Sequence, residues 1–238
     1  WIVSYDATGN DVISQNNSAS DGSGTWTLLS TSRLIASDNN HSHILFVPPD
    51  TGQTMLLIAY GNANLSQKLN DGTVWATNWT SIVTDTGTTE ALARNGWSGV
   101  KDTSNQVNII YITSAGNLKH IQRAGTTPWG WSTISSDITG LTSHTKCTLA
   151  VNGTDLYLFY DKGDQKIYYR KYDGSWGSES NLKTDTTTIQ GAISCYESAQ
   201  NNEIGIVWVE GANSPYNVVF DKISIIAPPA GGQIIWVN

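Results

Sequence analysis

Four acidic residues of this 238-residue chain have types and places that could support acid–base chemistry. Asp38, Asp102 and Glu197 lie at or near segments that we predict to be inner strands of a repeated β-fold, and Glu210 lies nearby. Two carboxyl groups held roughly 5–10 Å apart can hydrolyse a glycosidic bond. Acidic residues are common near the rims of such folds, and no pattern singles these four out. We therefore predict no catalytic residues and keep glycoside hydrolysis as an alternative.

Histidine supplies the next candidate chemistry, because His41 and His43 form a His-x-His pair. On a strand this spacing places both rings on one face, where they could hold a metal ion. No third ligand is identifiable, and Ser and Asn residues surround the pair, which favours a solvated loop. His120 and His144 have no partner pattern. We predict no metal site and no cofactor.

The composition favours an all-β protein and excludes several classes. Only 14% of the residues are charged, the formal net charge is −7, and there are ten Trp and ten Tyr. Leu, Glu, Lys and Arg are too scarce for a coiled coil, and aromatic residues are too common for a disordered tail. No basic patch could neutralise phosphates, so we expect no nucleic-acid partner. No apolar run approaches the roughly 18 residues of a membrane helix, so we expect no membrane insertion.

A repeat of about 50 residues runs through the chain. Each unit has an apolar strand that ends in an aromatic residue, then a polar turn and a second strand. These aromatic residues are Tyr5, Tyr60, Tyr111, Tyr160 and Trp208. A Trp opens a further strand in the first four units, at Trp26, Trp79, Trp131 and Trp176, and another strand precedes the last four aromatic residues. Four short strands per unit are typical of propeller blades. We predict an all-β fold: a five-bladed β-propeller of four-stranded antiparallel blades.

The predicted single domain covers residues 1–238, with blades at 1–32, 33–86, 87–137, 138–185 and 186–226 and a tail at 227–238. The first unit starts at what should be its second strand. Residues 231–238 look like the missing innermost strand, so we predict that the C-terminal strand closes the ring. The tail can also form the outer strand of the fifth blade, or complete a neighbouring molecule. Pro228 and Pro229 favour an extended segment.

The two cysteines fit the repeat. Cys147 lies 13 residues before Tyr160, and Cys195 lies 13 residues before Trp208. We therefore expect equivalent positions on the inner strands of adjacent blades, where a disulfide between blades is geometrically feasible. Two small buried thiols are the alternative, because Cys is among the most buried residue types. No CxxC pattern of a metal or redox site is present.

Three predicted turns carry Asp-Gly before a Trp: residues 20–26 (SDGSGTW), 70–75 (NDGTVW) and 173–176 (DGSW). The repeat resembles the sialidase-like, Asp-box class of propellers, which carry Ser-x-Asp-x-Gly-x-x-Trp between the third and fourth strands. The position of the turn matches, and the Asp–Gly spacing differs. Physically, Asp caps a tight turn, Gly supplies a positive φ, and Trp packs between blades. We predict structural roles for these residues.

Sialidases of the class that the chain resembles need three arginines on the substrate carboxylate, an acid and a Tyr–Glu pair. This chain has four arginines in all: Arg33, Arg94, Arg123 and Arg170. Arg123 and Arg170 lie on or near outer third strands, away from the expected central pocket. We therefore predict that the repeats are non-catalytic.

Five Trp residues have no place in the repeat: Trp1, Trp75, Trp97, Trp129 and Trp236. A flat aromatic ring beside Asn, Asp or Arg suits the C–H face and the hydroxyls of a sugar, in sites that are shallow and wet. Packing between blades is the alternative reading of these rings. Our candidate ligand-binding residues are Arg94, Trp97, Asp102, Trp129 and Glu197.

The surface composition, rich in Ser, Thr and Asn, is typical of secreted and cell-surface β-proteins. No signal peptide is visible before Trp1, which we interpret as a processed mature protein or an excised piece. Five Asn-x-Ser/Thr sequons occur, close to the number expected by chance. They are Asn16, Asn40, Asn64, Asn78 and Asn152. We expect an extracellular or cell-surface location, with these asparagines as candidate glycosylation sites.

We therefore predict a non-enzymatic propeller that binds glycans or glycoconjugates, like a lectin, through aromatic-lined sites at blade junctions. The first alternative is a structural cell-surface or filament subunit that self-associates by strand exchange of residues 227–238. The second alternative is a glycoside hydrolase of a five-bladed propeller family. Fold analogy alone does not decide among them, because propellers host enzymes, lectins and scaffolds.

Overall fold

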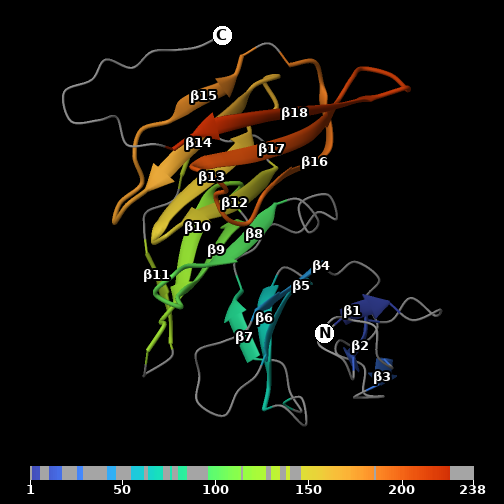
Figure 1. Ribbon diagram of the computed structural model, residues 1–238, viewed down its shortest axis with the longest axis vertical. Helices are drawn as coiled ribbons and strands as arrows, with labels where there is room; N and C mark the ends of the chain where they lie inside the picture. The colour runs from blue at the N-terminus through green and yellow to red at the C-terminus, as the bar shows by residue number, and fades with distance from the viewer. Residues whose placement is uncertain are drawn as a thin grey trace.

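In the part of the chain that the computed structural model describes, the regular elements are eighteen β-strands (Figure 1). The structure describes residues 2–5, 11–17, 26–28, 42–46, 55–61, 64–71, 76, 80–84, 96–113, 115–126, 130–134, 138–139, 146–184 and 186–225. The predicted tail at 227–238 lies outside these residues. Within them, no helix is long and apolar enough to span a bilayer.

Three sheets have four antiparallel strands each, in chain order. The second sheet contains β4 (Ser42–Phe46), β5 (Met55–Gly61), β6 (Asn64–Asn70) and β7 (Thr80–Val83). The third contains β8 (Trp97–Lys101), β9 (Val107–Ile112), β10 (Leu118–Arg123) and β11 (Trp131–Thr133). The fourth contains β12 (Cys147–Asn152), β13 (Asp155–Asp161), β14 (Ile167–Tyr172) and β15 (Ser180–Lys183).

Two further sheets have three antiparallel strands each. The first sheet contains β1 (Ile2–Tyr5), β2 (Asp11–Asn17) and β3 (Trp26–Leu28). The fifth contains β16 (Ile189–Cys195), β17 (Glu203–Glu210) and β18 (Asn217–Ser224). The prediction of an all-β protein built from four-stranded antiparallel units is confirmed. The number of blades and the closure of the ring stay predictions.

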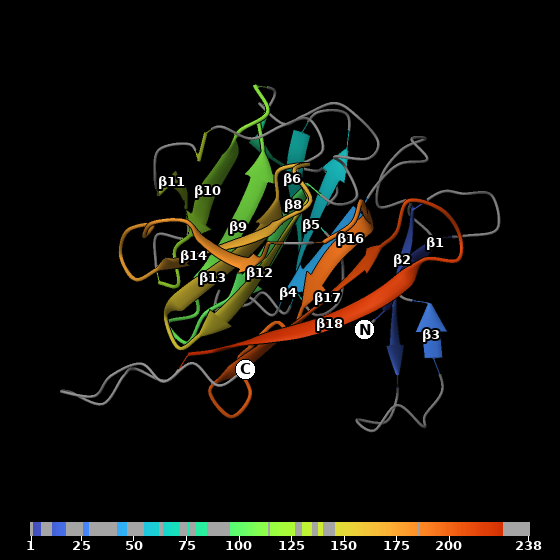
Figure 2. The same ribbon diagram turned by 90° about the horizontal axis from the view of Figure 1, so that it is seen from above.

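From the second sheet to the fifth, successive sheets meet along their first strands, as the blades of a propeller do. Strand β8 packs between β4 and β12, and β12 packs in turn against β16 (Figure 2). Backbone hydrogen bonds reinforce the joints outside the sheets. Thr103 N donates to Gly153 O at 3.1 Å between the third and fourth sheets, and Val151 N donates to Glu197 O at 2.8 Å between the fourth and fifth.

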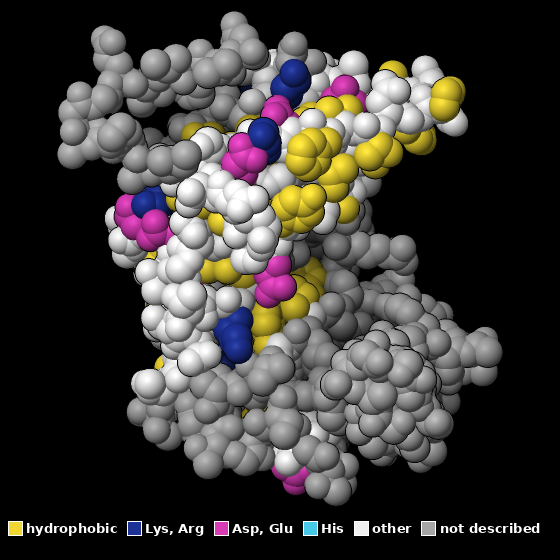
Figure 3. Space-filling model, viewed as in Figure 1, with side chains coloured by type: hydrophobic (Ala, Val, Ile, Leu, Met, Phe, Trp, Pro, Cys, Tyr) yellow, Lys and Arg dark blue, Asp and Glu magenta, His cyan; other side chains and the backbone are white. Residues whose placement is uncertain are grey.

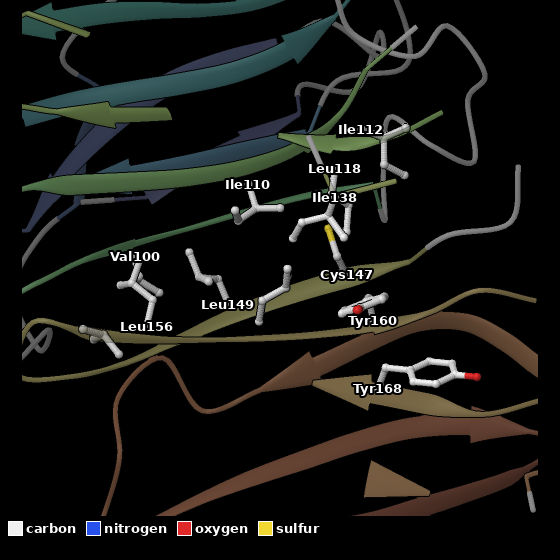
Figure 4. Close-up of a cluster of buried hydrophobic side chains, with 12 residues drawn as sticks. Val100, Ile110, Ile112, Leu118, Ile138, Cys147, Leu149, Leu156, Tyr160 and Tyr168 are labelled. Carbon is white, nitrogen blue, oxygen red and sulfur yellow. The ribbon is translucent and has the colours of Figure 1, made fainter. Parts of the chain in front are cut away.

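The core is divided into three apolar layers, one between each pair of neighbouring sheets from the second to the fifth. Strand β9 shows why: all six of its residues are buried. Ile109 and Tyr111 pack toward the second sheet, whereas Ile110 and Ile112 pack toward the fourth. Figure 4 shows the layer between the third and fourth sheets, where Ile110 lies near Leu149. A strand that is buried on both faces needs apolar side chains at nearly every position, not only at every second one.

The expected equivalence of the two cysteines is wrong. Cys147 pairs with Tyr160, but a register shift between Gln190 and Ile193 places Ile193, and not Cys195, opposite Trp208. Both thiols are free, so no disulfide joins the fourth and fifth sheets. Burial raises the pKa of both, that of the Cys195 thiol to about 11, which keeps them protonated near neutral pH.

The turn at 173–176 supports the structural roles predicted for its Gly and Trp. Gly174 has a φ of +107°, and Trp176 forms a bridge back to Tyr172. The Trp176 ring lies 5.6 Å from His120 of the third sheet, so it does pack between sheets. The Asp173 carboxylate contacts the Lys171 ammonium at 3.3 Å instead of capping the turn. Membership of the Asp-box class stays an unconfirmed prediction.

Replacement of Gly99 by Ala should destabilise the joint between the second and third sheets. A Cβ there would overlap Cδ1 of Ile109 and lie 3.2 Å from Cζ of Phe46, and both residues are buried. Overpacking of this kind costs about 1–3 kcal/mol of unfolding free energy. Urea denaturation of the parent chain and of Gly99→Ala measures the loss.

Gly205→Ala is the matched control, because Gly205 also lies within a strand. Its added Cβ would meet the ring ends of Phe220 at 2.8 Å and Tyr196 at 2.9 Å, and these exposed rings can move aside. We expect a change within about 0.5 kcal/mol. Equal losses in the two variants would contradict the rigid joint described here.

Candidate functional site

A groove of about 280 Å³ lies where the second and third sheets meet. It runs between β7 of the second sheet and β9, β10 and β11 of the third. Its lining residues are Ile82, Val83, Thr84, Tyr111, Ile121, Trp131, Ser132 and Thr133. Two of the lining residues are aromatic, Tyr111 and Trp131, and the prediction of binding sites at blade junctions stays a prediction.

Strand pairing explains why these side chains converge. Tyr111 and Ile121 belong to the buried layer between the two sheets and form the apolar base of the groove. Thr133 lies opposite Ile121 across the β10–β11 pair. The half-buried Trp131 begins β11, and its Nε1 donates to Oε1 of Gln67 on β6 at 2.9 Å. This bond fixes the Trp131 ring and ties the third sheet to the second.

The groove combines an apolar base with a hydroxyl rim. Ile82, Val83 and Ile121 are aliphatic, and the exposed hydroxyls of Thr84, Ser132 and Thr133 stand beside them. None of the lining residues named here is charged. An amphipathic, uncharged ligand fits this chemistry, with C–H groups against the aromatic rings and hydroxyls at the rim.

The junction between the third and fourth sheets has different side chains at the position that corresponds to the groove. Tyr160 corresponds to Tyr111, because each lies opposite the first residue of its inner strand. By the same alignment, Arg170 corresponds to Ile121. An arginine therefore stands where the groove has its aliphatic base.

Arg170 belongs to a cluster of charged side chains that are 22–26% exposed. Its Nε donates to the Tyr160 hydroxyl at 2.9 Å, and that hydroxyl donates to Glu179 Oε2 at 2.6 Å. Lys162 Nζ donates to Glu179 Oε1 at 2.8 Å and lies 3.9 Å from the centre of the Tyr168 ring. The charges are satisfied within the cluster, so it ties the outer edge of the fourth sheet together.

The Tyr160–Glu179 contact is a Tyr–Glu pair that the sequence analysis did not anticipate, because no spacing rule links a β13 residue to the loop before β15. Such a pair could act as a nucleophile only if the phenol were easily ionised. Burial, followed by the hydrogen bond to Glu179, raises the pKa of Tyr160 above its usual range. Although burial alone would raise it, hydrogen bonds from Lys162 and Tyr160 lower the pKa of Glu179. The pair is therefore a phenol donating to a carboxylate, a structural contact.

Asp102, a predicted ligand-binding residue, is committed to the loop between β8 and β9. It is only 5% exposed. Its Oδ1 accepts the backbone N–H groups of Ser104 and Gln106, each at 2.9 Å, and its Oδ2 accepts Asn108 Nδ2 at 3.1 Å. With both oxygens occupied, Asp102 organises the loop and is not available as a free acid, base or sugar acceptor.

The other predicted site residues are spread over the fold. Trp97 is 5% exposed and packs in the layer between the second and third sheets, as its packing alternative requires. The Glu197 side chain is exposed, away from the groove lining. Arg94 and Trp129 lie outside the described residues, as do Asp38 and His41.

Among the sequons, Asn152 is exposed at the end of β12. Asn16 and Asn64 lie on β2 and β6, and Asn40 and Asn78 lie outside the described residues. Within the described part of the chain, no group of three His, Cys, Asp or Glu residues could hold a metal ion.

A buried polar network joins Asp102 to His120 through Asn108. Because Asn108 Nδ2 donates to Asp102, its Oδ1 is the acceptor for His120 Nε2 at 3.0 Å. This assigns the proton of the neutral imidazole to Nε2 and leaves Nδ1 buried without a hydrogen bond. The ring makes edge contacts with Tyr172 at 5.0 Å and with Trp176 at 5.6 Å, both across the junction between the third and fourth sheets. Burial lowers the pKa of His120 from 6.5 to about 4.

No protein-family model matches the chain, and no curated protein matches it. Among solved structures it is similar to AofleA from Arthrobotrys oligospora, with a TM-score of 0.58 at 11% identity over 78% of this chain and 57% of that one. A triple arginine-to-alanine variant of AofleA gives a TM-score of 0.63 at 11% identity over 94% of this chain and 68% of that one. This chain therefore spans only part of AofleA, and the likeness is one of fold.

The six-bladed, fucose-recognising propeller lectin of Aleuria aurantia gives a TM-score of 0.47 at 13% identity, over 97% of this chain and 92% of that one.

His120 should make the fold sensitive to mild acid. Its pKa in the folded state, about 4, lies below the 6.5 of an unfolded chain. Between these values the unfolded state binds the proton and the folded state does not, so stability is full above pH 6.5 and falls as the pH drops toward 4. The total loss is about 3 kcal/mol.

Denaturation midpoints between pH 4 and 7 test this for the parent chain and for His120→Gln. Gln can still donate to Asn108 but does not titrate. We expect a smaller loss of stability over this window in the variant. An equal pH dependence in both proteins would show that His120 is not the titrating group.

Proposed function

We propose that this chain is a non-catalytic, carbohydrate-binding β-propeller whose groove between β7 and β11 takes an uncharged sugar. The observation that carries the proposal is the groove itself. It combines a Trp131 ring held by Gln67, an aliphatic base and a rim of hydroxyls. A sugar has the complementary surfaces, one face of C–H groups and an edge of hydroxyls.

Charge supports an uncharged ligand. None of the groove-lining residues is cationic, and the chain carries a formal net charge of −7. An acidic sugar would lose hydration without gaining an ion pair. A hexose or a deoxyhexose can instead place an apolar edge against Ile82, Val83 and Ile121.

The groove is small and open, so we expect weak binding at one site. Contacts to bridging water suit such a surface. If several junctions each bind a sugar, a branched glycan can occupy more than one of them at once. It then binds more tightly than a single sugar, because the sites are linked within one chain. The proposal includes five blades in one propeller, which the five sequence repeats support. It also includes an extracellular location, which the Ser-, Thr- and Asn-rich composition supports.

Glycoside hydrolysis gains no support from Asp102, Glu197 and Glu210, the three of its four candidate acidic residues that the structure describes. Both oxygens of Asp102 accept hydrogen bonds inside the β8–β9 loop. Glu210 accepts the indole N–H of Trp208 at 2.9 Å, and the Glu197 side chain is exposed. We therefore place the function in binding.

Trp131→Ala should weaken sugar binding about fivefold, because stacking on an aromatic ring contributes on the order of 1 kcal/mol. The binding partner is first found on an array of neutral glycans, with α-methyl-L-fucoside included because a variant of the Aleuria aurantia lectin binds it. Titration calorimetry then compares the parent chain with the variant. Tyr216→Ala removes an exposed ring outside the groove and should bind like the parent.

Ser132→Trp provides a second variant that leaves the core intact, because Ser132 is exposed at the rim. The added ring should block the groove and abolish binding while the unfolding free energy stays unchanged. If both groove variants bind a glycan as well as the parent chain does, the sugar site lies elsewhere. If no glycan binds at millimolar concentration, the proposed function is wrong.

A further inference from the structure

The fifth sheet differs from the second, third and fourth sheets at its outer edge. The second, third and fourth sheets each end in a short strand (β7, β11 or β15) that pairs with the long third strand. The fifth sheet ends at β18, and none of the other described strands pairs with the outer edge of β18. An unpaired strand edge offers free backbone donors and acceptors to any other extended segment.

The face of β18 that points away from the fourth sheet is also unusually apolar. Val218 and Phe220 on β18 are 73% and 60% exposed, with Tyr216 and Tyr196 beside them at 48% and 57%. Figure 3 shows hydrophobic side chains gathered over β17 and β18. Long, apolar, open edges promote aggregation, and native proteins usually cover them.

In two of the three complete sheets the fourth strand pairs with the first half of the third strand, whereas in the third sheet β11 pairs with the second half of β10. In the second sheet, β7 pairs with Leu65, Ser66 and Gln67, in the first half of β6. In the fourth sheet, β15 likewise pairs with the first half of β14. The first half of β18 contains Val218 and Phe220. A fourth strand at this place would cover their flanks.

The chain supplies a suitable segment at the right spacing. Residues 124–130, 173–179 and 71–79 connect the third and fourth strands of the three complete sheets. Connections of these lengths after Ser224 lead to a start between residues 232 and 234. The sequence at 233–237 is Gln-Ile-Ile-Trp-Val, rich in the β-branched and aromatic residues that favour strands.

We propose that residues 233–237 add to the outer edge of β18 of the same molecule, as the antiparallel fourth strand of the fifth sheet. Ile234 and Trp236 would lie on one face of that strand and Ile235 and Val237 on the other. Either register therefore places apolar side chains beside Val218 and Phe220. The inference does not depend on sugar binding. It differs from the ring closure expected from the sequence, which would pair this segment with the first sheet.

Hydrogen exchange measured by mass spectrometry on the full chain tests the assignment. Peptides covering 217–224 and 233–237 should both be protected. The double variant Ile234→Pro/Trp236→Pro removes backbone donors from the added strand. It should speed exchange about tenfold or more in both peptides and leave β9 and β13 unchanged. Ala230→Pro, in the connecting segment, is the control and should preserve the protection.

Three results would overturn the proposal. Random-coil exchange of 233–237 in the parent chain would show that the segment adds to nothing. A loss of protection in β1, but not in β18, would assign the segment to ring closure through the first sheet. A dimer by light scattering that dissociates in the double variant would show that the strand is donated by a second copy. A monomer with coupled protection of both peptides supports addition within one molecule.

Discussion

Face-to-face packing of successive sheets is the constraint on which the rest of this structure depends. Every sheet between two others must present apolar side chains on both faces, as β9 does with Ile109 toward one neighbour and Ile110 toward the other. This removes the usual polar face of an antiparallel sheet. Polar side chains that could bind a ligand therefore lie at the outer ends of the junctions. There the short fourth strands end, and side chains of two sheets are exposed to water.

The outer ends of two successive junctions show how one backbone arrangement yields two chemistries. Ile121 in the third sheet leaves a groove, whereas Arg170 at the corresponding place in the fourth sheet recruits Glu179 and Tyr160 into an ion cluster. The aromatic residue in the second strand is common to both, since Tyr111 and Tyr160 are each at most 2% exposed. The tyrosine ring found at both junctions packs in the core. The residue on the next strand, Ile121 or Arg170, determines whether the junction has an open groove.

The repeat made the strands and much of the core predictable, because buried aromatic residues at a fixed spacing report the packing between sheets. Trp208 is 1% exposed, as a residue that anchors a repeat should be. The site was less predictable. Trp97 and Asp102 looked like ligand-binding residues because type and position, but not burial, are visible in a sequence. The groove joins residues of two repeats. The register shift in β16, which places Ile193 and not Cys195 opposite Trp208, has no sequence signal that we recognised.

The Trp131–Gln67 hydrogen bond gives one side chain two duties, since it joins the second and third sheets and also lines the groove. A ligand that packs against this ring buries apolar surface of both sheets and so favours the assembled junction over an opened one. Binding to the folded state alone stabilises a protein in proportion to RT ln(1 + [L]/Kd). Any ligand that binds this groove is therefore thermodynamically linked to the integrity of the junction, and it should resist the separation of the second sheet from the third.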